Sequence, residues 1–289
     1  MPNRRALVLG VTGMVGAALA RALHDDGWQV FGAARGTDRT IALKLAKEGI
    51  EVMQYDVTTD DPGALPDVTV VFLEIWDPSR PDLTWDINFY GVGKVVERYA
   101  GQAEFVNGST IDVYGSGPSL PAEEAPCRPD SEYGRSRFAQ ERLIDYFCYC
   151  SGSRGIHVRY AHANTAERGK VRRIAEAILA GESLGPNPDA KTQVISLEDF
   201  VRVTVAALQK AETRPIAVNC CHPRVWTERE LATEIHRRLG KGKVVFGRES
   251  GGVEQSVVAD PARMVKWFGQ PRIPVNEVLE RVCRLLKSR

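Results

Sequence analysis

Three glycines stand near the start of the chain, where an apolar run changes to a helical pattern. They lie in the stretch GVTGMVG as Gly10, Gly13 and Gly16, three residues apart. Glycine allows a backbone to turn tightly or to approach another group closely, and the N–H groups at the start of a helix favour an anion. A tight turn without a ligand could show the same glycines. Their place between a first strand and a first helix favours a dinucleotide site.

The next strand-like run bears on which dinucleotide would bind. An acidic residue at its end would bind the ribose 2′-OH of NAD and repel the 2′-phosphate of NADP. Here the run ends Gly-Ala-Ala-Arg at residues 32–35, without a carboxylate. Arg35, alone or with Arg39, could make charge-assisted contacts with a phosphate, so the pattern favours NADP over NAD. Two solvated loop arginines are the alternative interpretation.

Strand-like apolar runs alternate with helical segments over the first 160 residues. The expected strands are 6–9, 29–34, 51–55, 68–75, 104–107 and 157–160, and the expected helices are 14–26, 40–48, 88–100 and 131–150. Continuous apolar strands in such an alternation predict a parallel sheet that is covered on both faces. Since the crossovers are right-handed, we expect a doubly wound α/β sheet, the Rossmann fold.

The alternation becomes less regular after residue 160. The stretch GESLGPNPDAKTQ is rich in glycine and proline and is expected to be irregular, whereas TERELATEIHRRLG predicts a helix with Thr227 as N-cap and Glu230 at the third position. We therefore expect a dinucleotide-binding domain over residues 1–160, to which 192–222 return. Residues 161–191 and 223–289 would form a smaller C-terminal substrate-binding lobe.

Composition excludes several other classes of protein. The chain is 43% hydrophobic and 26% charged, and its formal net charge of +1 gives no electrostatic reason to expect nucleic acid or an acidic membrane as partner. It has no long apolar run that predicts a membrane span and no signal-peptide pattern. Its six cysteines include no Cys-x-x-Cys pair and its five histidines no His-x-x-x-His pair. We therefore expect a cytoplasmic protein with reduced thiols, no metal site and a small-molecule substrate.

The spacing of the three glycines resembles the turn of the short-chain dehydrogenase/reductase superfamily. The rest of the chain resembles the extended subgroup, the NAD-dependent epimerase/dehydratase-like proteins. The similar segments are YDVTTD, NFYGVGKVVERYA, GSTIDVYGSG, YGRSRFAQERLI, VRYAHAN, QVISLEDFVRV and IAVNCC. The resemblance implies a Rossmann fold, NADP or NAD as cofactor, and hydride transfer to or from a carbonyl or hydroxyl carbon. It also suggests a homodimer formed through the helices that contain Asn88 and Tyr133.

The same resemblance places the cofactor on the glycine turn and on segments that follow later strands, with Asp56 at the adenine. Together with the arginine inferred from charge, the cofactor-binding set is Gly10, Thr12, Gly13, Met14, Val15, Gly16, Arg35, Asp56, Val57 and Asn88.

The catalytic tyrosine of the family corresponds to Tyr133, which would exchange a proton with the substrate oxygen. A free tyrosine has a pKa of about 10, so it needs a nearby positive charge to act near neutral pH. The family has lysine one helical turn further on, and this chain has Arg137 there. Arginine stays charged but does not readily release a proton, which speaks against a relay of the lysine type. A surface ion pair of Arg137 with Glu141 is the alternative interpretation.

The segment GSTIDVYG supplies the remaining catalytic candidates. Thr110 falls where the family has the hydroxyl that binds the substrate oxygen, and Ser109 is the neighbouring candidate. Asp112 could act as acid or base, or be a hydrogen-bonded structural residue. Sugar-nucleotide 4,6-dehydratases have two carboxylates here, whereas Ile111 replaces one of them in this chain.

Three functions remain open at this point. The favoured one is an NADP(H)-dependent oxidoreductase. The others are a sugar-nucleotide epimerase or dehydratase with tightly bound NAD, and a non-catalytic dinucleotide sensor, since the usual lysine is Arg137. The segments GVTGMVG, WQVFGAARG and DVTVVFLEIW also resemble the progesterone 5β-reductase/iridoid synthase group, which reduces conjugated enones with NADPH. That group has a lysine near the position of Asp112, which counts against its chemistry here.

Overall fold

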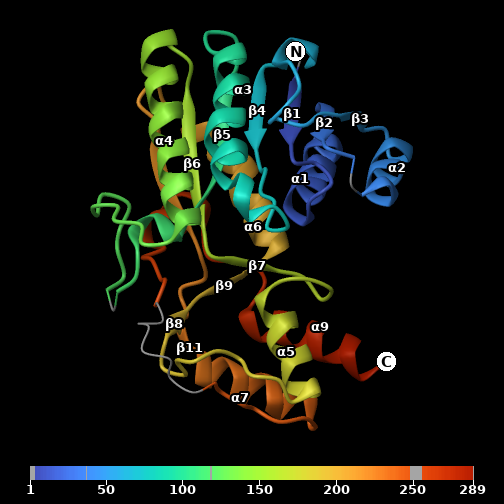
Figure 1. Ribbon diagram of the computed structural model, residues 1–289, viewed down its shortest axis with the longest axis vertical. Helices are drawn as coiled ribbons and strands as arrows, with labels where there is room; N and C mark the ends of the chain where they lie inside the picture. Colours follow the sequence, from blue (N-terminus) through green and yellow to red (C-terminus); the bar gives the residue numbers. More distant parts are fainter. Residues whose placement is uncertain (1–3, 37, 118, 248–255, 289) are drawn as a thin grey trace. The chain divides into compact units, whose positions relative to one another are not determined.

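A sheet of seven strands, in the order β10-β6-β5-β4-β1-β2-β3, is the centre of the fold (Figure 1). The computed structural model describes residues 4–36, 38–117, 119–247 and 256–288. The strands of the sheet are β1 (Arg5–Leu9), β2 (Gln29–Ala34), β3 (Glu51–Gln54), β4 (Val70–Leu73), β5 (Glu104–Thr110), β6 (Gly155–Tyr160) and β10 (Ile216–Cys220). The pairs β1–β2, β1–β4, β2–β3 and β4–β5 are parallel. The doubly wound α/β fold predicted from the sequence is confirmed.

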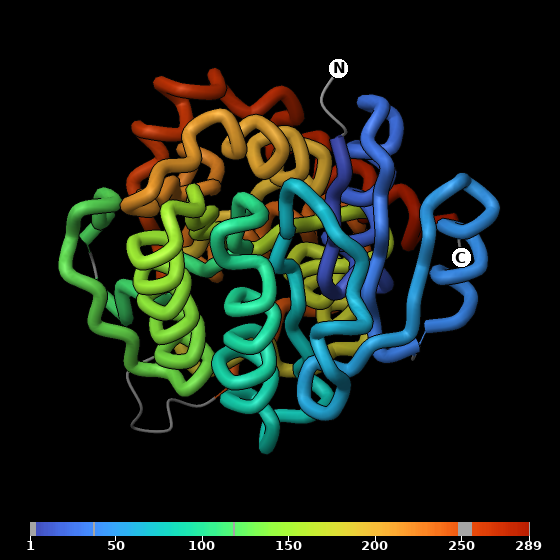
Figure 2. The backbone as a smooth tube through the Cα atoms, turned by 90° about the horizontal axis from the view of Figure 1, so that it is seen from above, coloured from blue at the N-terminus to red at the C-terminus, as the bar shows by residue number. Residues whose placement is uncertain are grey.

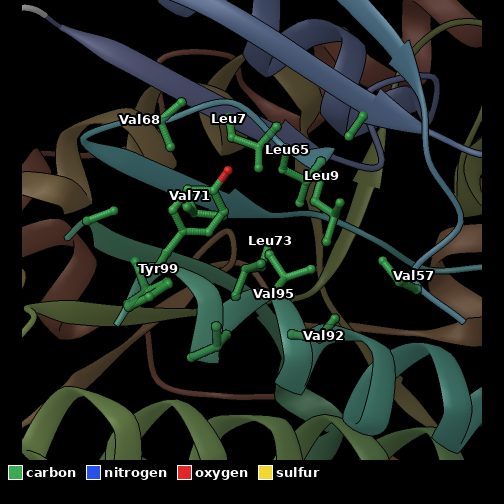
Figure 3. Packing of buried hydrophobic residues seen from close by; sticks show 14 of the residues in the cluster. Leu7, Leu9, Val57, Leu65, Val68, Val71, Leu73, Val92, Val95 and Tyr99 are labelled. Atoms are coloured by element: carbon green, nitrogen blue, oxygen red, sulfur yellow. The ribbon is translucent and has the colours of Figure 1, made fainter. Parts of the chain in front are cut away.

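Helices cover the sheet and form its core with it. They are α1 (Met14–Asp25), α2 (Arg39–Lys47), α3 (Val92–Tyr99), α4 (Glu132–Ser151) and α6 (Leu197–Ala207). Helices α3 and α4 lie side by side (Figure 2) and bury apolar side chains in one cluster with β1, β4 and β5. Val71 and Leu73 of β4 meet Val92 and Val95 of α3 there (Figure 3). Because residues 6–9 of β1 are at most 1% exposed, that strand is apolar on both faces, as an inner parallel strand must be.

Two elements differ from the sequence prediction in ways that affect the site. The apolar run 68–75 forms a strand only over Val70–Leu73, so Glu74 and Ile75 lie beyond its carboxyl end. The expected helix 88–100 starts with the π-helical segment η3 (Asp86–Gly91), and α3 follows it. Hydropathy alone could not locate either change, because both lie within continuous periodic or apolar patterns.

The chain divides into two units. The first consists of Met1–Val113, Ser131–Arg159 and Val201–Val218, and the second of Tyr114–Asp130, Tyr160–Phe200 and Asn219–Arg289. Among the described residues, no helix is long and apolar enough to span a membrane.

Where the structure describes it, the second unit has two small sheets and four helices outside the central sheet. Strand β7 (His162–Asn164) pairs in parallel with β9 (Val194–Ser196), and β8 (Lys191–Thr192) pairs antiparallel with β11 (Trp226–Thr227). The helices are α5 (Lys170–Ala180), α7 (Glu228–Leu239), α8 (Ala262–Phe268) and α9 (Val275–Lys287). Apolar faces of α5, α7 and α9 form its core. The predicted N-terminus of α7 is confirmed, because Thr227 and Glu230 form a reciprocal capping box there.

Candidate active site

The glycine turn connects β1 to α1 at the carboxyl edge of the sheet. Gly10 has a φ of 86°, and a Cβ on it would lie 2.7 Å from the carbonyl oxygen of Glu74. A Cβ on Gly16 would overlap the carbonyl oxygen of Gly10. Gly13 is the N-cap of α1 and has no side chain to cap the helix. The turn therefore needs glycine at positions 10 and 16, and it leaves the first N–H groups of α1 without a side-chain cap.

This arrangement fits a dinucleotide. Thr12 lies in the turn, and Met14 and Val15 open α1, so these residues surround the N-terminus that would hold the phosphates. The sheet order reverses between β1 and β4, and ligands of open α/β sheets bind at the carboxyl ends of the strands where the order reverses.

Tyr133 lies in the first turn of α4, near the end of β4. Ser131 caps that helix by accepting a hydrogen bond from the backbone N–H of Gly134 at 3.0 Å. The ring centre of Tyr133 is 5.4 Å from that of Trp76 and 5.4 Å from the guanidinium carbon of Arg137. Tyr133 and Arg137, predicted to share one helix face, thus lie close together, and the Trp76 ring from the loop after β4 also lies beside Tyr133.

Arg137 is buried, with 1% of its surface exposed. Its guanidinium donates hydrogen bonds to Gln140 Oε1 at 3.0 Å, to the carbonyl of Gly108 at 3.3 Å and to the carbonyl of Ile75 at 2.5 Å. The alternative of a surface ion pair with Glu141 is wrong. The positive charge is instead fixed where β4 and β5 end.

Glu141 has a separate buried partner. It accepts hydrogen bonds from Arg159 at 2.9 and 2.7 Å and from the Ser109 hydroxyl at 2.6 Å. Burial alone would raise its pKa, but the charge and hydrogen bonds of Arg159 outweigh burial and lower the pKa to about 2. The Ser109 hydroxyl therefore points to this ion pair, and we do not assign it a catalytic role.

Thr110 ends β5, and Asp112 follows it in the 3₁₀ turn 111–114. The Thr110 hydroxyl donates a hydrogen bond to the Asp112 carboxylate, and the backbone N–H of Asp112 lies 3.2 Å from the same hydroxyl. Asp112 therefore orients the hydroxyl proton of Thr110. Ile111 is buried, so the second carboxylate of a dehydratase pair is missing from this turn.

Glu74 is a site residue that the sequence analysis missed. Both of its carboxylate oxygens are buried and have no hydrogen-bond partner among the described residues. A Cβ on Gly108 would overlap Glu74 Oε2, so glycine at that position makes room for the carboxyl group. Burial raises its pKa to about 8, although the charge of Arg137 opposes the shift. The signal in the sequence was a single carboxylate at the end of a buried parallel strand.

A second group of charges follows β2, β3 and β4. Arg35 comes directly after β2 and pairs with Asp77. Arg80 lies 3.1 Å from Asp77 and 3.4 Å from Asp56. Asp77 and Arg80 were not predicted, whereas Arg39, named as a helper of Arg35, is exposed at the start of α2.

Val57 and Asn88, the two remaining cofactor candidates, also lie in the first unit. Val57 is buried, and a Cβ on Gly91 would come within 2.7 Å of its carbonyl oxygen. Asn88 is buried in the π-helical segment and donates a hydrogen bond to Ser136 Oγ at 3.0 Å. Asn88 thereby connects η3 to the helix that carries Tyr133.

The chain belongs to the NAD dependent epimerase/dehydratase family, whose model matches residues 6–221. This confirms the family predicted from the motifs and, at the level of the family, the expectation of an NAD(P)-dependent enzyme. A similar protein is 2′-dehydrokanamycin reductase of Streptomyces kanamyceticus, 24% identical over 251 residues, which are 82% of this chain and 67% of that protein. Another is (S)-8-oxocitronellyl enol synthase of Catharanthus roseus, 37% identical over 81 residues, 25% of this chain and 20% of that protein.

The similarity to UDP-glucose 4-epimerase of Streptomyces lividans covers 28% of that protein, so the chain matches less than a third of the length of two of these three relatives. Among solved structures, dTDP-glucose 4,6-dehydratase of Bacillus anthracis in complex with NAD has a TM-score of 0.85. The similarity covers 99% of this chain and 97% of that chain at 16% sequence identity. At this identity the similarity shows the fold alone.

Proposed function

We propose that this chain is an NADP(H)-dependent oxidoreductase of the extended short-chain type, acting on a carbonyl or hydroxyl carbon of a small molecule. The observation that carries the proposal is the position of Tyr133, whose ring centre lies 5.4 Å both from the Trp76 ring and from the buried guanidinium of Arg137. We assign dinucleotide binding to the first unit and substrate selection to the second.

The bound nicotinamide would donate hydride to a carbonyl carbon or accept it from the carbon of an alcohol. Tyr133 gives a proton to the substrate oxygen in reduction and takes it back in oxidation. Arg137 would supply a fixed positive charge beside the Tyr133 ring. It does not serve as the proton source, since arginine remains protonated.

Thr110 would bind the substrate oxygen as a hydroxyl. Because its own proton is donated to the Asp112 carboxylate, its oxygen is left to accept a hydrogen bond from that substrate hydroxyl. The preference for NADP(H) is supported by Arg35 at the end of β2, where the ribose 2′ position is read. The second candidate is an epimerase or dehydratase reaction, in which the cofactor is reduced transiently and then reoxidised, because the family contains epimerases and dehydratases.

The test uses a panel of aldehydes, ketones and conjugated enones with NADPH, for wild type and for Tyr133→Phe. Phenylalanine keeps the ring and its two neighbours but removes the hydroxyl. We expect NADPH consumption by the wild type, a loss of at least about 100-fold in kcat in the variant, and unchanged NADPH binding. Tyr149→Phe is the matched control on the same helix, because that side chain is 69% exposed.

Other outcomes would favour other functions. Sugar-nucleotide conversion without net NADPH use, with NAD that cannot be stripped, would favour an epimerase or dehydratase. Dinucleotide binding without turnover of any of these substrates, sugar nucleotides included, would favour the sensor.

We also propose a homodimer through the surface of η3, α3 and α4, since Tyr90 and Tyr146 expose more than half of their surface there. The cysteines form no disulfide among the described residues, which supports a reducing compartment such as the cytoplasm. Sedimentation of the wild type against Tyr146→Glu tests the dimer, which the charge should dissociate.

A further inference from the structure

Asp77 is the centre of the charged group that follows β2, β3 and β4. Its Oδ2 accepts hydrogen bonds from Arg35 and, at 3.1 Å, from Arg80. Its Oδ1 accepts two from Ser79, at 3.1 Å from the backbone N–H and 2.6 Å from the hydroxyl. One carboxylate oxygen thus holds both guanidinium groups, while the other oxygen is anchored to its own loop.

Each arginine of the group has an aspartate partner. Arg80 also lies 3.4 Å from Asp56, so two arginines face two aspartates. The side chains of Arg35 and Arg80 are each 25% exposed and that of Asp77 is 14% exposed. Such partly buried pairs are screened less by salt than surface pairs are.

Asp77 stays ionised near neutral pH. Burial alone would raise its pKa, but the hydrogen bonds from Ser79 and the charge of Arg35 hold the pKa below its usual value. A second anion that approaches Arg35 therefore meets a permanent negative charge.

The ribose 2′ position of a dinucleotide is read by the residue at the end of the second strand, which here is Arg35. We propose that Asp77 is a specificity-determining residue for the cofactor. Its carboxylate occupies the anion position made by Arg35 and Arg80, and the 2′-phosphate of NADP must displace it. This inference rests on the proposed function, which assigns the 2′-phosphate contact to Arg35.

Two consequences follow. Arg80 becomes a second ligand of the 2′-phosphate, although it comes from the loop after β4 and not from β2. The wild type therefore prefers NADPH over NADH less strongly than a site with Arg35 and Arg80 but without Asp77 would, because the ion pairs with Asp77 must break before the arginines can bind the phosphate.

The experiment measures dissociation constants of NADPH and NADH by nicotinamide fluorescence for stripped wild type and Asp77→Asn. Asparagine can still accept the hydrogen bonds of Ser79 but carries no charge. We expect the NADPH preference, the ratio of the two constants, to rise at least about tenfold, mainly through tighter NADPH binding. Asp67→Asn is the matched control, because its partner Arg98 holds it in an exposed ion pair elsewhere in this unit.

A second variant, Arg80→Gln, keeps the inference testable if Asp77→Asn does not fold. It should weaken NADPH binding about tenfold and leave NADH binding nearly unchanged. An unchanged or smaller NADPH preference in folded Asp77→Asn overturns the inference, and a smaller one would mean that the carboxylate positions the arginines or binds the 2′-OH itself. Arg35→Gln separates the two proposals. If it leaves the preference of the wild type unchanged, the NADP assignment itself fails.

Discussion

Replacing Glu74 with glutamine should stabilise the protein in neutral and alkaline solution and change little in acid. The carboxylate oxygens of Glu74 are buried without a hydrogen-bond partner among the described residues. Burial raises its pKa from 4.5 to about 8, against the opposing charge of Arg137. Glutamine has nearly the same shape and no proton to lose.

The sign follows from proton binding. In the unfolded chain Glu74 loses its proton near its ordinary pKa of 4.5, whereas the folded protein keeps the proton until about pH 8. Between these values the folded state binds the extra proton, so the free energy of unfolding falls as pH rises, by about 1.4 kcal/mol per pH unit. The loss is complete above pH 8 and has an upper bound of roughly 5 kcal/mol.

The assay is urea denaturation of wild type and Glu74→Gln between about pH 5 and about pH 9. The variant should gain stability relative to wild type with each unit of pH until about pH 8. Glu141→Gln is the control without a trend over this range, because the Glu141 pKa is lowered to about 2 and its carboxylate is ionised in both the folded and the unfolded chain above about pH 5. A difference between Glu74→Gln and wild type that is the same at every pH would refute the reasoning.

The remaining predictions concern stability, binding and turnover. Glu141→Gln should lower the free energy of unfolding at pH 7 by about 3–5 kcal/mol, because it removes the negative charge that faces the buried guanidinium of Arg159. The control is the exposed Glu277→Gln, which should lower it by roughly 1 kcal/mol or less. Urea denaturation measures both. Gly16→Ala should abolish NADPH binding measured by fluorescence, because its Cβ would overlap the carbonyl oxygen at the start of the turn. Asp112→Asn should lower kcat about tenfold or more, because it changes the acceptor that orients the Thr110 hydroxyl, and should leave the NADPH dissociation constant unchanged. The first expectation is contradicted if Glu141→Gln and Glu277→Gln lower the free energy of unfolding equally. The second is contradicted if Gly16→Ala binds NADPH, and the third if Asp112→Asn keeps the kcat of the wild type.

The sequence predicted the architecture because local patterns determine it. Continuous apolar strands such as residues 6–9 predict an inner parallel strand, and the capping box at Thr227 marks the start of a helix from four residues alone. The same holds for the helix that carries Tyr133 and Arg137, since a spacing of four residues places both on one face.

The sequence could not predict what depends on contacts between distant segments. Arg137 could equally have faced solvent, and its burial depends on a carbonyl group that follows β4 and on another within β5. Glu74 was not predicted as a site residue, because it stands in the apolar run 68–75 and nothing in that pattern indicated that the strand ends at Leu73. Asp77 was missed because a loop aspartate after a strand looks like an ordinary turn residue until its distance to Arg35 is known.

The central claim is that this site binds NADP(H) and uses it. The most direct measurement is a titration of cofactor-stripped wild type with NADPH and NADH, followed by nicotinamide fluorescence. The account predicts that both bind and that NADPH binds more tightly. Tighter binding of NADH, or binding of neither, would contradict it.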